Sequence, residues 1–380
     1  MDAGYRSVNA PLSGDTKGGF QNGTATSAII FKGTEDLGGG LAASFQYELN
    51  PDFIGGAGLT GNVLGSSAAA DVSAAGTNPY VRTSNGANGY NFIGLTSASL
   101  GGVKVGRLNT STLAAWGTGS VFGTALGSGY GSNGNVFTTA SSSVANFNQT
   151  APTRFNNAVE YTSPTIAGFT ARALYVPQVN NPTADGGENN ATVATLAGTN
   201  RQGVTDLGLG YSQGPLNVQF AQQKAKQGNA INALVNTGTA AADANSNYKL
   251  TTLAANYTIG ATKIYAATWT EKNTLSTAWN SVDSAGKMVG VKYTMGAIDL
   301  MASTGKRNNK NAAQAASLAT ASTITDKDVS VSGIGADYNF SKRTTAWVRY
   351  ETRDANTNVT AETSAAGVTK TTAVGIRHTF

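Results

Sequence analysis

The sequence contains no cysteine, a single histidine, few prolines and little charge. Of its 380 residues, 8 are Pro, one is His, and only 12% are Asp, Glu, Lys or Arg. Ordinary soluble domains carry about 25% charged residues, so the composition is not typical of a cytoplasmic enzyme. The missing cysteines exclude disulfides, thiolate metal sites and cysteine nucleophiles. A lone histidine excludes most catalytic schemes and nearly all zinc sites, so we expect no enzyme, metal or cofactor.

Long apolar runs and dense basic blocks are also missing. No segment approaches the roughly 18 apolar residues of a membrane helix, which excludes a helical membrane protein. The first ten residues have neither the basic nor the apolar region of a signal peptide, so we expect that any export signal has been removed. The 26 Lys and Arg are scattered and the net charge is only +5. Nucleic acid is therefore not an expected partner.

What the sequence does contain is polarity that alternates with a period of two. In the segment 169–175, Phe169, Ala171 and Tyr175 alternate with Thr170 and Arg172, which is typical of a strand with one apolar face. Short turns, at 213–215, 260–261 and 296, separate long stretches rich in Gly, Ala, Ser, Thr and Asn. Many apolar faces end in an aromatic residue, as strands do at a membrane interface. The pattern predicts a transmembrane β-barrel.

The expected fold is all-β: an antiparallel barrel of sixteen strands that forms a single domain over 1–380. A soluble β-sandwich would carry more charge on its outer face, and a β-solenoid or adhesin would repeat at a fixed period. The predicted strands are 1–7, 25–33, 41–50, 89–98, 103–108, 155–164, 168–177, 204–213, 216–225, 246–258, 262–272, 286–295, 297–306, 327–340, 343–353 and 371–380. This number of strands encloses a water-filled lumen rather than a packed interior.

Five segments resemble the Gram-negative general porins of the beta-proteobacterial type, and they occur in the order that the family shows. They are KGTEDLGGGL at 32–41, VKVGR at 103–107, RFNNAVEY at 154–161 with Ser-Pro at 163–164 and Gly-Phe at 168–169, NFSKRT at 339–344, and VGIRHTF at 374–380. The resemblance implies a homotrimer in the outer membrane, in contact with its lipid, through which small ions and hydrophilic solutes diffuse. It also implies a third loop, 108–153, folded into the lumen.

Three departures from the family pattern affect the expected channel. Family members have several residues before the segment that resembles Met1–Tyr5, so the first strand is expected to be shortened. Anion-selective members carry basic residues where Ala28, Gly94 and Leu95 stand, and of that set Arg154 alone matches. The 46 residues of 108–153 include no charged residue, whereas such loops usually present carboxylates. The resemblance therefore implies a weaker transverse field than in a typical porin.

Parity along the strands places several charges on the face opposite the apolar one, which is the lumen face. They are Lys32, Glu48, Lys104, Arg154, Glu160, Arg172, Lys292, Asp337, Arg349 and Arg377. Basic residues outnumber acidic ones, and in a low-dielectric channel they would concentrate anions. The simpler interpretation is that a charge points inward because the lipid face excludes it, at a cost of about 2–4 kcal/mol for Arg or Lys at the midplane. We favour a functional role for Arg154.

Two other motifs carry no chemistry. The string GYGSNG at 129–134 matches GxGxxG, but neither a strand before it nor a helix after it is predicted, so it does not indicate dinucleotide binding. His378 has the same parity as Ile376 and Phe380, which places it on the outer face without a partner for catalysis. The sequence predicts a passive outer-membrane channel, with weak anion preference. The alternatives are a porin that prefers neutral or weakly polar solutes and an adhesin-like surface scaffold.

Overall fold

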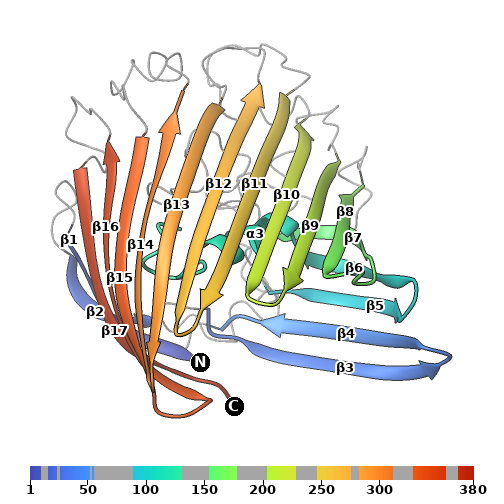
Figure 1. Cartoon of the computed structure of the whole chain (residues 1–380), viewed down its shortest axis with the longest axis horizontal. Coiled ribbons are helices and arrows are strands. Elements are labelled where there is room, and N and C mark those ends of the chain that lie inside the picture. Colours follow the sequence, from blue (N-terminus) through green and yellow to red (C-terminus); the bar gives the residue numbers. More distant parts are fainter. Residues whose placement is uncertain are drawn as a thin grey trace, which may run out of the picture.

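The computed structural model describes residues 1–9, 16–23, 26–51, 54, 89–130, 154–177, 203–227, 246–274, 282–310, 328–356 and 367–380. These residues form one curved antiparallel sheet with a single α-helix on its concave side (Figure 1). None of the described helices is long and apolar enough to cross a membrane.

The described part of the chain contains seventeen strands. Their bounds are β1 (Asp2–Asn9), β2 (Thr16–Asn22), β3 (Ile29–Gly38), β4 (Leu41–Leu49), β5 (Asn91–Ser97), β6 (Gly101–Asn109), β7 (Arg154–Thr162), β8 (Phe169–Val176), β9 (Val204–Gln213), β10 (Leu216–Gln227), β11 (Ser246–Ile259), β12 (Thr262–Thr274), β13 (Val282–Met295), β14 (Ile298–Asn309), β15 (Asp328–Asn339), β16 (Thr344–Asn356) and β17 (Gly367–His378). The helix, α3, covers Ser111–Gly119 between β6 and β7.

Neighbours in the sheet are neighbours in the sequence, except where the two ends of the chain meet. Each strand from β3 to β16 pairs antiparallel with the strand that follows it. The last strand, β17, pairs with β1, with Tyr5 opposite Val374, and β1 pairs with β2. The first and last strands of the chain therefore lie side by side, as a barrel requires.

The predicted second strand, 25–33, is wrong in its bounds, and the described residues hold one strand that was not among the sixteen predicted. The structure has β2 before Gly23 and β3 from Ile29 onward. β2 pairs with β1, whereas β3 pairs with β4. Sequence pattern missed β2 because its segment, TKGGFQN, holds two glycines and no apolar alternation.

Tight turns join the strands at one end of the sheet, and several have glycine at a position that requires a positive φ. Gly214, Gly260 and Gly296 each begin a two-residue turn, with φ of 58°, 57° and 60°. Glycine adopts this backbone conformation without the steric cost that a side chain would add. The turns predicted at these three positions are confirmed.

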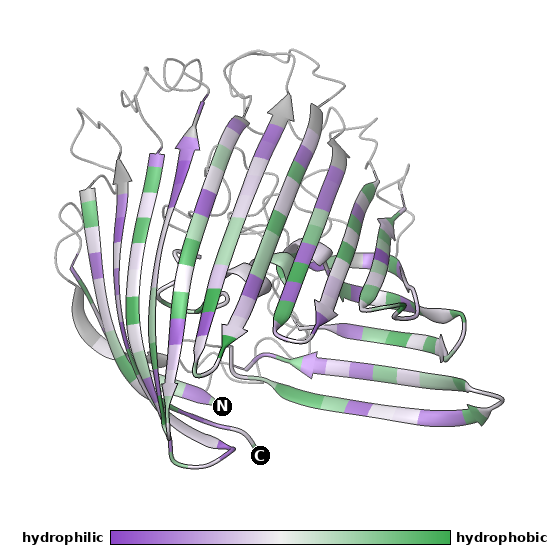
Figure 2. Cartoon of the chain, viewed as in Figure 1, coloured by the Kyte–Doolittle hydropathy of each residue, from purple (hydrophilic) through white to green (hydrophobic). Residues whose placement is uncertain are grey.

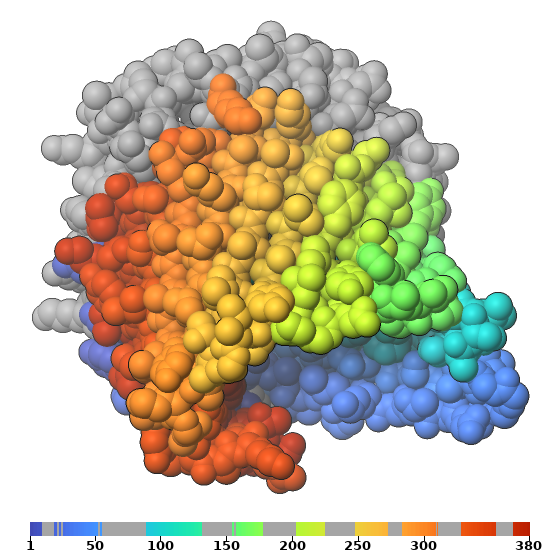
Figure 3. All heavy atoms as spheres, viewed as in Figure 1, coloured from blue at the N-terminus to red at the C-terminus, as the bar shows by residue number. Residues whose placement is uncertain are grey.

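Burial is inverted relative to a soluble protein. On β7, Val159 and Tyr161 are 37% and 44% exposed, whereas Glu160 between them is 2% exposed. The alternation appears along the strands as green and purple bands (Figure 2). From β9 to β14 the strands form a continuous outer surface (Figure 3). An apolar outer face with charges turned inward is the pattern of a barrel in lipid.

The concave side of the sheet carries an apolar core of its own. Trp116 of α3 and Trp269 of β12 are 0% and 1% exposed, and inward side chains of β6–β13 and β15 join them. Leu108, Phe155 and Leu174 belong to the same cluster. The lumen is therefore filled on this side, rather than being water-filled across its whole width.

Candidate functional site

A short uncharged segment, residues 110–130, lies on the concave side of the sheet and is called here the inward segment. It begins with α3, which contacts β9, β10, β11, β12 and β13. The hydroxyl of Thr110 caps the helix by accepting a hydrogen bond from the Leu113 amide at 3.1 Å. Ser120 ends the helix, and its amide donates to the Trp116 carbonyl at 3.0 Å. Residues 131–153 of the predicted inward loop lie outside the described part.

Aromatic packing attaches the middle of the inward segment to the wall. The rings of Trp116 and Trp269 meet edge to face, with centroids 5.4 Å apart. The Trp116 indole donates to the Gly123 carbonyl at 2.8 Å, which satisfies its polar atom inside the core. Asn256 of β11 donates from Nδ2 to the Thr118 carbonyl at 2.9 Å. These contacts fix the helix against β11 and β12.

Two wall carboxylates hold the two ends of the inward segment. Asp206 of β9 accepts from the Ser111 amide at 2.6 Å and from the Thr112 hydroxyl at 2.9 Å. Glu351 of β16 accepts, through one oxygen, from the amides of Gly127 and Gly129 at 2.8 and 3.0 Å. Charge-assisted hydrogen bonds of this kind are stronger than neutral ones. The segment is therefore anchored on β9 and on β16, far apart along the sheet.

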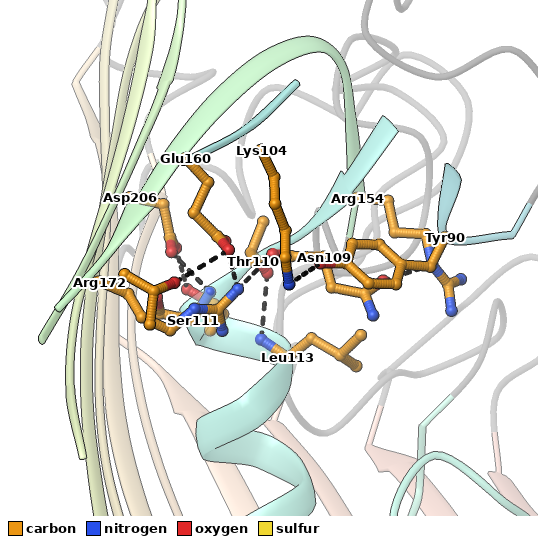
Figure 4. Close-up of polar contacts among 12 residues, drawn as sticks. Tyr90, Lys104, Asn109, Thr110, Ser111, Leu113, Arg154, Glu160, Arg172 and Asp206 are labelled. Atoms are coloured by element: carbon orange, nitrogen blue, oxygen red, sulfur yellow. Dashed lines mark hydrogen bonds and ion pairs between the residues drawn. The ribbon is translucent and has the colours of Figure 1, made fainter. Parts of the chain in front are cut away.

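The first group of charged residues lies on the inner face of β6, β7 and β8, beside the start of the inward segment (Figure 4). Lys104 donates to the Tyr90 hydroxyl at 3.1 Å, and Arg154 donates from Nε to the Asn109 side chain at 2.6 Å. Arg172 forms an ion pair with Glu160 and donates to the Asn109 carbonyl at 3.1 Å. We call Lys104, Arg154, Glu160 and Arg172 the β6–β8 group.

The second group lies on β15, β16 and β17. Arg349 and Asp337 form an ion pair at 2.6 Å, and Arg377 lies 4.0 Å from the same carboxylate. Arg353 pairs with Glu351 at 2.7 Å. The Arg349 guanidinium also lies over the ring of Phe122, 5.4 Å from its centroid, so it contacts the inward segment. We call these five charged residues the β15–β17 group.

The structure therefore brings together six of the seven predicted site residues, in two groups. Lys104, Arg154, Glu160 and Arg172 form the first, and Arg349 and Arg377 belong to the second. The seventh, Lys32, is apart from both: it is exposed on β3, opposite Gln46 in the register. Within the described residues, no group of three or more His, Cys, Asp or Glu side chains could hold a metal ion.

The prediction missed the anchors Asp206 and Glu351 and the aromatic residues Tyr90 and Phe92. Asp206 has the opposite parity to the outward residues Leu207 and Leu209, so parity would have placed it on the inner face. Its partners, however, lie 94 and 95 residues away in the sequence. No local spacing indicates a contact of that kind.

Comparison with known proteins agrees with the inverted burial and the inward segment, which together define an outer-membrane β-barrel. The sequence matches the family of Gram-negative porins over residues 1–358. The chain belongs to that family, and it is an outer-membrane channel protein.

Solved porins share the fold at low sequence identity. The anion-selective porin from Comamonas acidovorans has a TM-score of 0.69 and is 20% identical, over 100% of this chain and 97% of that chain. OmpF of Salmonella typhi, in a complex with daunomycin, has a TM-score of 0.64 at 15% identity, over 100% and 96%. The trimer form of OmpT from Vibrio cholerae has a TM-score of 0.60 at 15% identity, over 100% and 98%. No curated protein matches the sequence.

Proposed function

We propose that this porin is a passive diffusion channel for small hydrophilic solutes, without chemistry of its own, and that it weakly prefers anions. The observation that carries the proposal is the state of Lys104 and Arg154. Within the described residues, both meet neutral groups, Tyr90 and Asn109, rather than carboxylates. Their positive charge is therefore available to a passing ion.

The surroundings leave this charge unbalanced. The inward segment has no charged residue, and the carboxylates around Lys104 and Arg154 already have partners. Glu160 pairs with Arg172, Asp206 holds the segment, and Glu48 accepts hydrogen bonds from the Tyr90 amide and from the Asn50 side chain. In a narrow channel with low-dielectric walls, a fixed charge attracts counter-ions more strongly than it does in bulk water. The β6–β8 group should thus favour anions at the place where the segment occupies part of the lumen.

The other predicted residues take smaller parts in this proposal. Lys32 is exposed on β3 and Arg377 is 42% exposed, so both would add positive charge to the wall outside the β6–β8 group. Arg349 is 5% exposed and paired with Asp337. Its charge would act on the inward segment rather than on the solute.

Reversal potential in a salt gradient tests the role of Arg154. Arg154→Glu in a planar bilayer at 0.1 M KCl should move the potential toward cation preference, because the Debye length there is about 10 Å. Lys342→Glu makes the same charge change in an exposed turn and should shift the potential less. An unchanged potential in Arg154→Glu would remove this residue from the conduction path.

We further propose that the channel is a homotrimer in the outer membrane. OmpT, one of the structural neighbours, is a trimer in the form compared above. In this chain the outer face holds exposed apolar residues, including Tyr5 and Phe20, whose rings pack edge to face at 5.8 Å. Native mass spectrometry in several mild detergents should give the mass of three chains. A monomer mass in all of them would contradict the trimer.

A further inference from the structure

We propose that the lumen wall at β5 and β6 holds a binding site for aromatic carboxylates, formed by Tyr90, Phe92, Lys104 and Arg154. The inference rests on the proposed channel function and names a class of solute for it. Two aromatic rings and two cations occur here together on the inner face of the sheet. The rings suit an aromatic solute, and the cations suit its carboxylate.

The two rings form one surface. Their centroids are 4.8 Å apart at an interplanar angle of 42°. Both side chains are half-buried, and both pack at the margin of the internal core instead of inside it. Aromatic pairs prefer offset and edge-to-face arrangements at such separations, so a third ring can add to this pair.

Lys104 lies directly against this aromatic surface. Its Nζ is 4.6 Å from the Phe92 ring centroid and 5.5 Å from that of Tyr90, and it donates to the Tyr90 hydroxyl. Cation–π contacts hold the ammonium group over the rings without neutralising its charge. A bound carboxylate could therefore pair with Lys104 while its own ring rests on the aromatic surface.

Two glycines on the paired strands make room for this arrangement. Gly94 is opposite Lys104 in the register, and Gly106 is opposite Phe92. A Cβ atom on Gly94 would lie 2.7 Å from the Val103 carbonyl oxygen and 2.8 Å from the Lys104 Cγ. One on Gly106 would meet the backbone of β5 at the Asn91 carbonyl oxygen, and it would lie 2.9 Å from the Phe92 Cα. Side chains at these two positions would therefore displace the stem of the lysine and the backbone that carries Phe92.

Arg154 supplies a second cation near the same surface. It projects from β7 toward Tyr90 in Figure 4, and its Nε is held by Asn109 at 2.6 Å. That hydrogen bond uses one of the five N–H donors of the guanidinium and does not neutralise its charge. In Figure 4 the guanidinium and the Lys104 ammonium lie on opposite sides of the Tyr90 side chain. Arg154 therefore adds to the positive field that draws a carboxylate to this wall, and Lys104 is the direct partner of that carboxylate.

A comparison of carboxylates of similar size tests the site. Single-channel currents in 0.1 M KCl would be recorded while potassium benzoate or potassium cyclohexanecarboxylate is added. Both anions carry one carboxylate, but only benzoate has an aromatic ring. We expect the apparent Kd for benzoate to be about two- to tenfold lower, which is the range that an aromatic contact provides. Equal Kd values in the wild-type channel would overturn the proposal.

Variants distinguish the contribution of the Phe92 ring to binding from that of the Lys104 charge. Phe92→Leu keeps an apolar side chain but removes the ring, so the ratio of the two Kd values should approach one. Lys104→Gln should raise the apparent Kd of both anions and leave the ratio of the two Kd values unchanged. The matched control is Tyr265→Leu, which removes a ring 5.3 Å from the Nζ of Lys263 on β12, and it should keep both the ratio and the affinities. If Tyr265→Leu lowers the ratio as much as Phe92→Leu does, the proposed location is wrong.

Two further readouts keep these outcomes distinct. Heat-modifiable migration on gels shows whether each variant folds. If Phe92→Leu does not fold, Tyr90→Leu takes its place, and the same fall in the ratio of the two Kd values is expected. The chloride current of the wild-type protein tests the channel itself. No current would refute the proposed function, whereas an anion-preferring current without a benzoate preference would refute this inference alone.

Discussion

The two charged groups on the inner wall both combine basic and acidic residues, yet their cations have different partners. In the β6–β8 group, Lys104 and Arg154 contact a tyrosine hydroxyl and an asparagine. In the β15–β17 group, arginines pair with Asp337 and Glu351, and Glu351 also holds the inward segment. An arginine with a neutral partner keeps its field in the channel, whereas one that is paired with a carboxylate contributes to holding the structure. Counting basic residues in the lumen would not reveal this difference.

The largest effect should come from removing the partner of a buried cation. Asp337→Ala leaves Arg349, which is 5% exposed, without its close carboxylate. Loss of one member of a buried pair costs about 3 kcal/mol of unfolding free energy, because the remaining charge stays desolvated. Asn109→Ala, which removes the partner of half-buried Arg154, should cost less than about 1 kcal/mol. Guanidinium unfolding midpoints in detergent micelles measure both, and equal losses would contradict the distinction between the groups.

A medium effect is expected from releasing a paired arginine in the β6–β8 group. Glu160→Gln removes the negative charge that Arg172 now meets, beside Lys104. The reversal potential should move toward stronger anion preference, opposite in sign to the shift in Arg154→Glu. Glu351→Gln makes the same charge change in the other group, where the carboxylate holds the inward segment. Glu351→Gln should increase the fluctuations of the current and change the selectivity little. A selectivity change as large as that of Glu160→Gln would contradict the anchoring role of Glu351.

The smallest effect is the response of the wild-type channel to salt. Raising KCl from 0.1 M to 1 M shortens the Debye length from about 10 Å to about 3 Å, so the field of Lys104 and Arg154 is screened. Anion preference, measured from reversal potentials at a fixed concentration ratio, should decrease. Arg154→Gln should show a weaker dependence on salt, because less fixed charge remains to be screened. The same salt dependence in both proteins would mean that the selectivity arises elsewhere.

The sequence predicted the features that repeat locally. Alternation fixed the strand faces, and glycine turns such as Gly260 fixed the strand order, because both signals lie within a few residues. It missed β2, which lacks alternation, and it missed the anchors Asp206 and Glu351. Parity placed Arg349 in the lumen, but it could not show that Asp337 on the neighbouring strand takes up its charge. Contacts that depend on register between strands have no signature within one strand.

The internal core has a consequence for how the protein unfolds. Trp116 and Trp269 become exposed to solvent together, because the two rings pack against each other at the contact between α3 and β12. Detaching the inward segment alone would expose both rings to water inside an otherwise intact barrel, and this exposure penalises any partly open state. The wall and the segment should therefore come apart in a single cooperative transition. Indole fluorescence and circular dichroism should then report the same midpoint.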